Sequence, residues 1–284
     1  MSPDRGPDAR HPLLIVHSDD FGETIEITKG IRDCIDAGVV TSTTILANMP
    51  GTAFALDEAL RREERASFGV HLNLCEGAPL TTPRSLTDRD GQFLPKRKIA
   101  ALAMLRRIDR RELEVELRAQ IGRVLDAGVR VSHLDSHKHL HQLPIVASVV
   151  AGLATELGIE RIRCTLERGV WIPGLSPAAA LSRAVRTRLA RQAGPVFTAR
   201  GLRFPGRTFD IRQLLGTETE TRRLELLAGA DGVSEMICHP GTALADHEKP
   251  GSCARHAELE FLCSAEFGRL VAAAGVSLVT YWEC

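Results

Sequence analysis

Two adjacent acids stand at the end of an apolar run in the stretch LIVHSDDFG, residues 14–22. Neighbouring side chains on a regular strand point to opposite faces, so Asp19 and Asp20 could not both serve one site on a flat strand. At the end of a strand, where Gly22 allows the chain to turn, both acids can reach the same site. Carboxylates in such a position suit metal binding and proton transfer.

A second group of reactive side chains lies in VSHLDSHKHLHQLP, residues 131–144, where an aspartate and four histidines recur at every second position. They are His133, Asp135, His137, His139 and His141. An extended chain would place all five on one side. Residues i and i+2 are about 6.6 Å apart on a strand, whereas a metal–nitrogen bond is about 2.1 Å long, so at most two neighbours of this run can bind one ion without a turn.

The remaining ligands of such an ion must come from other strands. Asp20 and His71 are the candidates, because each stands at the end of a different apolar run. With one histidine of the 131–144 run they give a set of two histidines and an aspartate, which leaves coordination positions open for water. Open positions are typical of catalytic rather than structural metal sites.

These side chains can meet only if several strands end at one place. Short apolar runs alternate with the helical patterns at 26–38 and 109–128, which predicts an α/β fold with a parallel sheet. The strand candidates are 13–18, 42–47, 68–73, 131–136, 161–165, 233–238 and 276–281. We expect a distorted (β/α) barrel of about seven parallel strands, with an open doubly wound sheet as the alternative. Residues 12–284 would form this single domain, and residues 1–11 would be a disordered tail.

Composition sets limits on the partners of the chain. The formal net charge is zero, which gives no indication of nucleic-acid binding, and no apolar stretch approaches the roughly 18 residues that span a bilayer. The seven cysteines include no C-x-x-C pair, which favours reduced thiols in a cytoplasmic protein. The sequence is compatible with a homodimer.

Residues 161–207 contain ten arginines and one acid. We interpret this segment either as a solvated helix face or as a basic patch for an anionic group.

The ordered set of motifs resembles the YdjC-like carbohydrate deacetylases, the family of chitooligosaccharide deacetylases. The motifs that carry the resemblance are DDFG at 19–22, GVHLNL at 69–74, HLDSHKHLH at 133–141, CHPG at 238–241 and RHAELEFLCSAEF at 255–267. The resemblance implies a distorted β/α barrel that holds one divalent metal ion, magnesium or zinc. It also implies hydrolysis of an N-acetyl group on an amino sugar or an N-acetylglucosaminyl-bearing metabolite.

The resemblance assigns roles to individual residues. It implies that Asp20, His71 and His137 bind the metal and that Asp19 is the general base. It also makes Arg163, in the strand end RCTLERG, a candidate substrate contact.

Further roles follow from the strand ends. We expect His239 to be the general acid that protonates the leaving amine, because histidine titrates near neutral pH, with His139 and His141 as rivals for that role. Asp135 is expected to orient a histidine rather than to bind metal. Asn48 and Asn73, which follow the second strand candidate and end the third, are further candidates for substrate contact or support of the site.

Three other functions are compatible with the residues. Two histidines and a carboxylate also suit a non-heme iron oxygenase. A metal-dependent phosphoesterase could use the arginine-rich segment for phosphate. A sugar-binding relative without catalysis is the third alternative, and the adjacent acids argue against it because binding alone needs no base beside the ligand.

Overall fold

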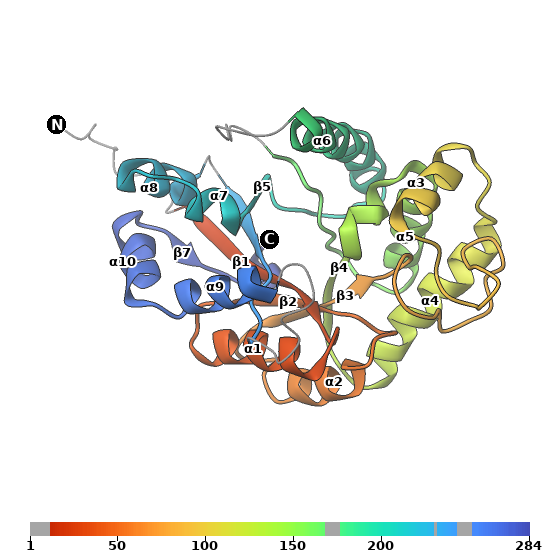
Figure 1. The fold of residues 1–284 in the computed structure, drawn as a ribbon, viewed down its shortest axis with the longest axis horizontal. Helices are drawn as coiled ribbons and strands as arrows, with labels where there is room; N and C mark the ends of the chain where they lie inside the picture. Colours follow the sequence, from red (N-terminus) through yellow and green to blue (C-terminus); the bar gives the residue numbers. More distant parts are fainter. Residues whose placement is uncertain (1–11, 168–176, 230–231, 243–251) are drawn as a thin grey trace.

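The computed structural model describes residues 12–167, 177–229, 232–242 and 252–284, so the expected tail at 1–11 lies outside the described residues. Its centre is a parallel sheet of seven strands (Figure 1). The strands are β1 (Leu13–Phe21), β2 (Ser42–Ile45), β3 (Ser67–Leu72), β4 (Val131–Ser136), β5 (Arg207–Asp210), β6 (Val233–Cys238) and β7 (Ser277–Leu278). The strand order is β4-β3-β2-β1-β6-β5, and β7 pairs with β1 beside this path.

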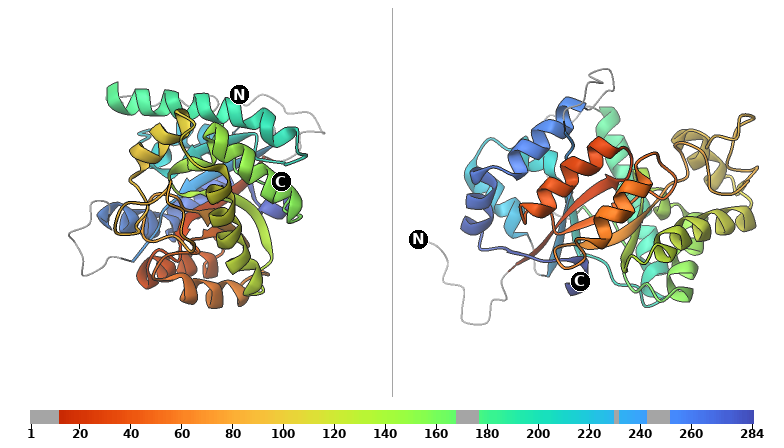
Figure 2. Two further views of the ribbon diagram at one scale, coloured as in Figure 1. Left: turned by 90° about the vertical axis from the view of Figure 1, so that its right-hand side faces the viewer. Right: turned by 90° about the horizontal axis from the view of Figure 1, so that it is seen from below.

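Helices surround this sheet on its outer side, as the two further views in Figure 2 show. They are α1 (Ile25–Asp36), α2 (Thr52–Leu60), α3 (Lys96–Met104), α4 (Arg110–Asp126), α5 (Pro144–Glu156), α6 (Pro177–Thr198), α7 (Ile211–Leu215), α8 (Glu220–Ala228), α9 (Ser252–Leu262) and α10 (Ala265–Ala273). Short 3₁₀ helices η1 (His137–Gln142) and η2 (Tyr281–Glu283) complete the described elements. Among these helices, none combines the length and apolar character that crossing a membrane requires.

The sheet does not close into a regular barrel, because its edge strands β4 and β5 do not pair with each other. Residues 161–166 lie between these edges. Their backbone bonds to Leu134 of β4 at 2.9 and 3.1 Å and accepts a hydrogen bond from Thr208 of β5 at 3.0 Å. The predicted strand at 161–165 is therefore wrong as a regular strand, since the segment makes only isolated bridges. The architecture is an α/β fold compatible with the expected distorted barrel.

Two helix starts follow directly from the sequence. The Thr24 side chain accepts a hydrogen bond from the backbone N–H of Ile27 at the start of α1. The Asp109 carboxylate accepts from the N–H groups of Arg111 and Glu112 and so begins α4. These side chains satisfy backbone donors that have no partner inside the helix. Correctly placed helices in turn fix the direction in which each neighbouring strand enters the sheet.

Strand β1 lies in the middle of the sheet and is buried along nearly its whole length. It pairs with β2 and β6 in parallel, and both neighbours bring their carboxyl ends to the same edge as β1. Strands β3 and β4 continue the sheet in the same direction. The polar residues at the ends of these strands therefore meet in one place.

Candidate metal centre

Asp19 and Asp20 occupy the carboxyl end of β1, and both line one cavity of about 250 Å³. Two backbone features make this shared orientation possible. Asp20 has a φ angle of +70°, in the left-handed region, and the pairing of β1 with β2 shifts register between Ser18 and Phe21. Both interrupt the alternation of a regular strand. An aspartate tolerates the left-handed conformation better than most residues, but the position still stores strain.

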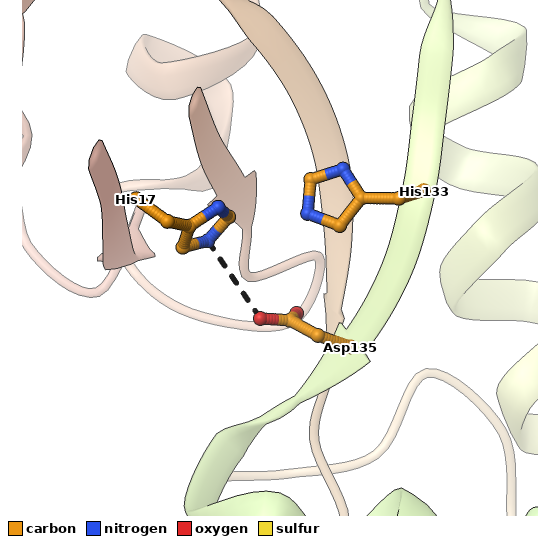
Figure 3. A group of neighbouring side chains, drawn as sticks. All are labelled: His17, His133 and Asp135. Atoms are coloured by element: carbon orange, nitrogen blue, oxygen red, sulfur yellow. Dashed lines mark ion pairs between the residues drawn. The ribbon is translucent and has the colours of Figure 1, made fainter. Parts of the chain in front are cut away.

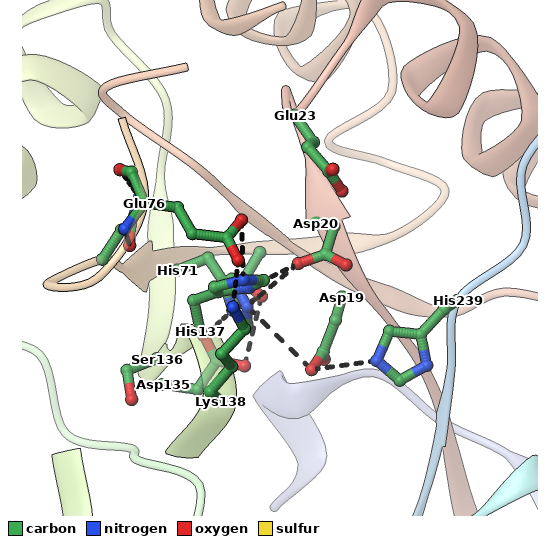
Figure 4. A network of polar contacts seen from close by, with 12 residues as sticks. Asp19, Asp20, Glu23, His71, Glu76, Asp135, Ser136, His137, Lys138 and His239 are labelled. Carbon is green, nitrogen blue, oxygen red and sulfur yellow. Dashed lines mark hydrogen bonds and ion pairs between the residues drawn. The ribbon is translucent and has the colours of Figure 1, made fainter. Parts of the chain in front are cut away.

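Asp20, His71 and His137 bring one possible ligand atom each to a common point, with all three atoms within 4.8 Å of one another. Asp20 Oδ1 lies 2.9 Å from His137 Nδ1 and 3.4 Å from His71 Nε2. The three residues come from the ends of β1 and β3 and from η1, which follows β4 (Figure 4). Two ligand atoms that each lie about 2.1 Å from one ion are separated by distances of this order.

The donor set fits a divalent cation by its chemistry and by its electrostatics. His71 Nε2 is buried and has no hydrogen-bond partner among the described residues. Burial opposes a positive charge on this ring, but Asp135 and Asp19 outweigh that effect and raise the pKa of His71 to about 10. The surrounding acids thus attract positive charge to this point. A metal cation would be attracted by the same negative charges and could bind the unpaired His71 Nε2.

Asp135 holds the other side of the His71 ring. Its Oδ1 lies 2.7 Å from His71 Nδ1, and its Oδ2 accepts a hydrogen bond from Thr44 Oγ1 at 3.2 Å. Asp135 is fully buried. This geometry leaves Nε2 of His71 directed at Asp20, and it gives Asp135 a position from which it could orient the His71 ring.

Arg163 lies beneath the cavity, fully buried, where the sequence suggests a substrate contact. Its Nη1 is 2.8 Å from Asp19 Oδ1 and 2.6 Å from Asp135 Oδ2, and its Nε donates to Glu235 at 2.8 Å. Burial opposes the charge, yet the three carboxylates raise the pKa of Arg163 further above its ordinary value. Arg163 is therefore placed to position Asp19 and Asp135 from below.

His239 and His139 line the cavity, whereas His141 is buried in hydrogen bonds elsewhere. His239 Nε2 lies 3.7 Å from Asp19 Oδ2, and 29% of its side chain is exposed. Burial, assisted by Arg163, lowers the pKa of His139 well below its ordinary value. His141 Nε2 donates a hydrogen bond to Arg163 O, 2.9 Å away, and burial lowers the pKa of His141 to about 4. Of the three, His239 has the most suitable position for a general acid.

The expectation that the five residues of the 131–144 run share one face is wrong beyond Ser136. The strand ends there, and Lys138 and His139 both adopt left-handed backbone angles in η1. The run therefore splits into residues at the metal centre and residues in the core. His133 belongs to the core, because its ring stacks on Tyr281 with centroids 3.5 Å apart.

His17, His133 and Asp135 form a second cluster of possible ligands (Figure 3), and Asp135 also contacts His71 of the first set. His17 Nε2 lies 3.7 Å from Asp135 Oδ2. Both nitrogens of His17 are already within hydrogen-bond distance of hydroxyl groups, those of Ser42 and Thr44. Burial and the nearby Arg163 charge lower the pKa of His17, so His17 is a neutral partner in a buried network of hydrogen bonds.

Two residues at the centre are not identified by sequence reasoning. Glu76, after β3, has Oε2 3.3 Å from His137 Nε2 and also pairs with Lys138. The nearby His137 ring, with help from Lys138, outweighs partial burial and lowers the pKa of Glu76 to about 2. Arg255, on α9, donates to Asp20 Oδ2 at 2.6 Å. The EG dipeptide after GVHLNL and the RHAELE motif are the signals that could have led to them.

Asn48 and Asn73 support the turn that carries Glu76. The Asn73 amide donates to Glu76 O at 2.8 Å, and its carbonyl oxygen accepts from Glu76 N at 3.2 Å. Asn48 donates to the same Glu76 carbonyl at 3.2 Å. Neither asparagine is among the residues that line the described cavity, so their contacts place them in support of the site.

The arginine-rich segment divides between structural and cavity positions, and its Arg168 lies outside the described residues. Arg183 and Arg186 both pair with Glu167, and Arg186 also lines the cavity. Arg161 donates to the Trp282 carbonyl at 3.0 Å. Acids or carbonyl groups therefore already engage these side chains, which favours the structural interpretation for this part of the segment.

Comparison with known proteins places these features in a family. A family profile described as YdjC-like protein matches residues 13–273. A carbohydrate deacetylase of Geobacillus stearothermophilus is 32% identical over 274 residues, which cover 95% of this chain and 96% of the relative. A human carbohydrate deacetylase is 33% identical over 247 residues, covering 80% of this chain and 74% of the relative.

Two further matches are shorter or more distant. A carbohydrate deacetylase of Brevibacillus brevis is 38% identical over 144 residues, and the match covers 50% of this chain. The chain spans little more than half the length of this relative, 56%. A solved structure from Enterococcus faecalis V583, described as a candidate cellobiose-phosphate cleavage protein, has a TM-score of 0.75 at 24% identity and covers 96% of this chain and 98% of its own. That likeness concerns the fold alone. The family profile matches most of the chain, and the Geobacillus stearothermophilus relative aligns with it over nearly the full length of both proteins. This chain therefore belongs to the YdjC-like protein family.

Proposed function

We propose that this protein is a metal-dependent carbohydrate N-deacetylase, which hydrolyses the N-acetyl group of an amino sugar or of an N-acetylglucosaminyl-bearing metabolite. The relatives named carbohydrate deacetylase support the reaction class. The observation that carries the proposal is the position of Asp19. It lines the same cavity as Asp20 and His137, and its Oδ2 lies 4.0 Å from His71 Nε2, where metal binding alone would need no second acid.

Asp20, His71 and His137 would hold one divalent ion, magnesium or zinc. When bound, the ion supplies Lewis acidity to a carbonyl oxygen and to water. Two imidazole nitrogens in the set favour zinc over magnesium, because magnesium prefers oxygen ligands. Arg255 engages Asp20 Oδ2, which leaves Oδ1 as the oxygen that faces the two histidines.

Asp19 would act as the general base that takes a proton from the attacking water. The Arg163 guanidinium, 2.8 Å from Asp19 Oδ1, faces this acid with a permanent positive charge and fixes its direction. Asp19 Oδ2 points toward His239. Positioned proton transfer of this kind typically contributes a factor of about 10² to 10⁴ in rate.

His239 would protonate the leaving amine as the C–N bond breaks. Its ring lies at the cavity, and its backbone N–H donates to Glu258 at 2.5 Å, which fixes the chain at this point. Ile237 and Phe209 also line the cavity and give it an apolar wall beside the acids. An acetyl methyl group would find a suitable surface there, while the charged side chains opposite would meet polar atoms of the sugar.

The test is to incubate zinc-loaded and chelator-treated protein with a panel of N-acetylated sugars and glycosylated metabolites. Acetate release and the loss of one acetyl mass from a panel member, in the metal-loaded sample alone, would support the proposal. Acetate release that is equally fast after metal removal would contradict the metal dependence. Absence of deacetylation across the panel, with phosphate release or oxygen consumption instead, would favour one of the other functions.

A further inference from the structure

The two histidines of the ligand set present opposite ring nitrogens to Asp20. His71 faces Asp20 Oδ1 with Nε2, at 3.4 Å, while its Nδ1 lies 2.7 Å from Asp135. His137 faces the same oxygen with Nδ1, at 2.9 Å, while its Nε2 lies 3.3 Å from Glu76 Oε2. Each ring therefore has a carboxylate on the nitrogen that points away from Asp20.

We propose that Glu76 is a positioning residue for the metal centre: it accepts a hydrogen bond from His137 Nε2–H and so directs His137 Nδ1 at the ion. Asp135 does the same for His71 from the opposite nitrogen, so that His71 binds through Nε2. This proposal rests on the proposed metal-dependent function. Carboxylates that hold the distal nitrogen of a histidine ligand fix its tautomer and increase its basicity.

The structure holds Glu76 in place from several directions. Asn73 binds both its backbone N–H and its carbonyl oxygen, and Asn48 donates to the same carbonyl. Lys138, the residue after His137, bonds to the Glu76 carboxylate from a left-handed backbone conformation. The turn after β3 and the strained start of η1 are thus tied together at this carboxylate.

The position of Glu76 distinguishes support from direct ligation. In Figure 4, Glu76 and Asp20 approach the histidine rings from different sides, and Glu76 contacts His137 at Nε2 while Asp20 contacts it at Nδ1. The clusters of possible ligands include Asp20, His71 and His137 together, without Glu76, within the described part of the chain. Its side chain is about one-third exposed at 36%, so replacing the carboxylate by an amide should leave the fold intact.

The first test measures zinc affinity of the full chain by competition with a chromogenic chelator. Glu76→Gln should bind zinc about 10- to 100-fold more weakly than the wild type, and Glu76→Asp should recover part of the loss. Glu114→Gln is the matched control, because Glu114 is an exposed acid that pairs with Arg118 on α4. The control should bind zinc as the wild type does.

The second test identifies the ligating nitrogens directly. Long-range ¹H–¹⁵N spectra of zinc-loaded protein with ¹⁵N-labelled histidine should show His137 protonated at Nε2 and His71 protonated at Nδ1. Ligation of His137 through Nε2, or a Glu76→Gln affinity within twofold of the wild type, would overturn the role of Glu76 and leave the proposed function standing. A wild-type protein that binds no zinc, magnesium or manganese would overturn the metal centre itself.

Discussion

Asp19 and Asp20 direct their carboxylates into one cavity although they are consecutive residues of a single strand. The left-handed backbone of Asp20, with φ of +70°, and the register shift beside it remove the alternation that would otherwise separate them. The two acids then receive different partners. Asp19 meets Arg163 and His239, whereas Asp20 meets His137 and Arg255.

Replacing Arg163 by methionine should destabilise the fold strongly, by about 3–5 kcal/mol in the free energy of unfolding. The change would leave Asp19, Asp135 and Glu235 buried without their shared cation. Urea unfolding measures the loss. Arg203→Met serves as control, because Arg203 pairs only at the surface with Glu160 and should cost less than about 1 kcal/mol. A loss below 1 kcal/mol for Arg163→Met would show that the buried ion pairs are not needed.

Replacing His239 by glutamine should lower kcat by about 10²- to 10⁴-fold while zinc affinity stays within a factor of two, because His239 lies outside the ligand set. Steady-state acetate release and chelator competition give the two values. His256→Gln is the control: His256 is a half-exposed histidine of α9 that pairs with Glu260. A kcat within threefold of the wild type would mean that another group protonates the leaving amine.

Gly69→Ala should destabilise the sheet by about 1–3 kcal/mol and reduce activity. A Cβ atom there would lie 2.5 Å from His133 O and 2.7 Å from the His133 ring, so β3 must move away from β4 and take His71 with it. Gly122→Ala is the matched control on α4, where an added Cβ meets nothing within 4 Å among the described residues. That control should be neutral or stabilising by up to about 1 kcal/mol. Equal unfolding midpoints for the two variants would refute the close-approach argument.

Acidification from pH 6.5 to 5 should destabilise the metal-free protein. Burial lowers the pKa of His133 to about 3 and that of His141 to about 4. Between pH 6.5 and 5 these histidines therefore bind protons in the unfolded state but stay unprotonated in the folded state. Stability therefore rises with pH, by about 2 kcal/mol per histidine across the window. Glu235 opposes this in part, because burial raises its pKa to about 6 and the folded state gains a proton. His71 opposes it near pH 6.5, because its pKa is raised to about 10 and the folded state keeps a proton that the unfolded state loses.

Urea midpoints between pH 6.5 and 5, with a chelator present, measure this dependence. His141→Gln should remove about one proton from the slope of stability against pH, whereas the surface variant His256→Gln should leave the slope unchanged. A slope that is the same in His141→Gln and in the wild type would show that His141 is not held neutral in the folded state.

The alternation of strands and helices made the fold class predictable, but two segments show where local sequence patterns fail to predict the strands correctly. Residues 161–165 match a strand pattern, yet they lie between the edges β4 and β5. There Ile162 makes an isolated bridge to Leu134 of β4, and Arg161 makes one to Arg203, ahead of β5. Strand β5, Arg207–Asp210, has only four residues and carries two charged ones. Strand β5 forms because it pairs with β6, and local sequence periodicity does not predict this long-range contact.

The candidate site was predictable where residues stand at strand ends, as with Asp20 and His71. The period-two spacing after Asp135 led to the wrong prediction of one shared face, because Lys138 and His139 leave the extended conformation. Glu76 and Arg255 reach the centre from a turn and a helix far away in the sequence, so only tertiary structure brings them there. The same holds for Arg163, whose burial under Asp19 no spacing predicts.

The central claim is that adjacent acids have different tasks, and comparing Asp19→Asn with Asp20→Asn tests it most directly. Bound zinc and acetate release are measured for both variants, with a sugar that the wild type deacetylates. Asp19→Asn should keep its zinc and lose at least about 100-fold in kcat. Asp20→Asn should lose the zinc together with the activity. Full activity in both variants, or zinc loss in Asp19→Asn with zinc retained in Asp20→Asn, would contradict the account.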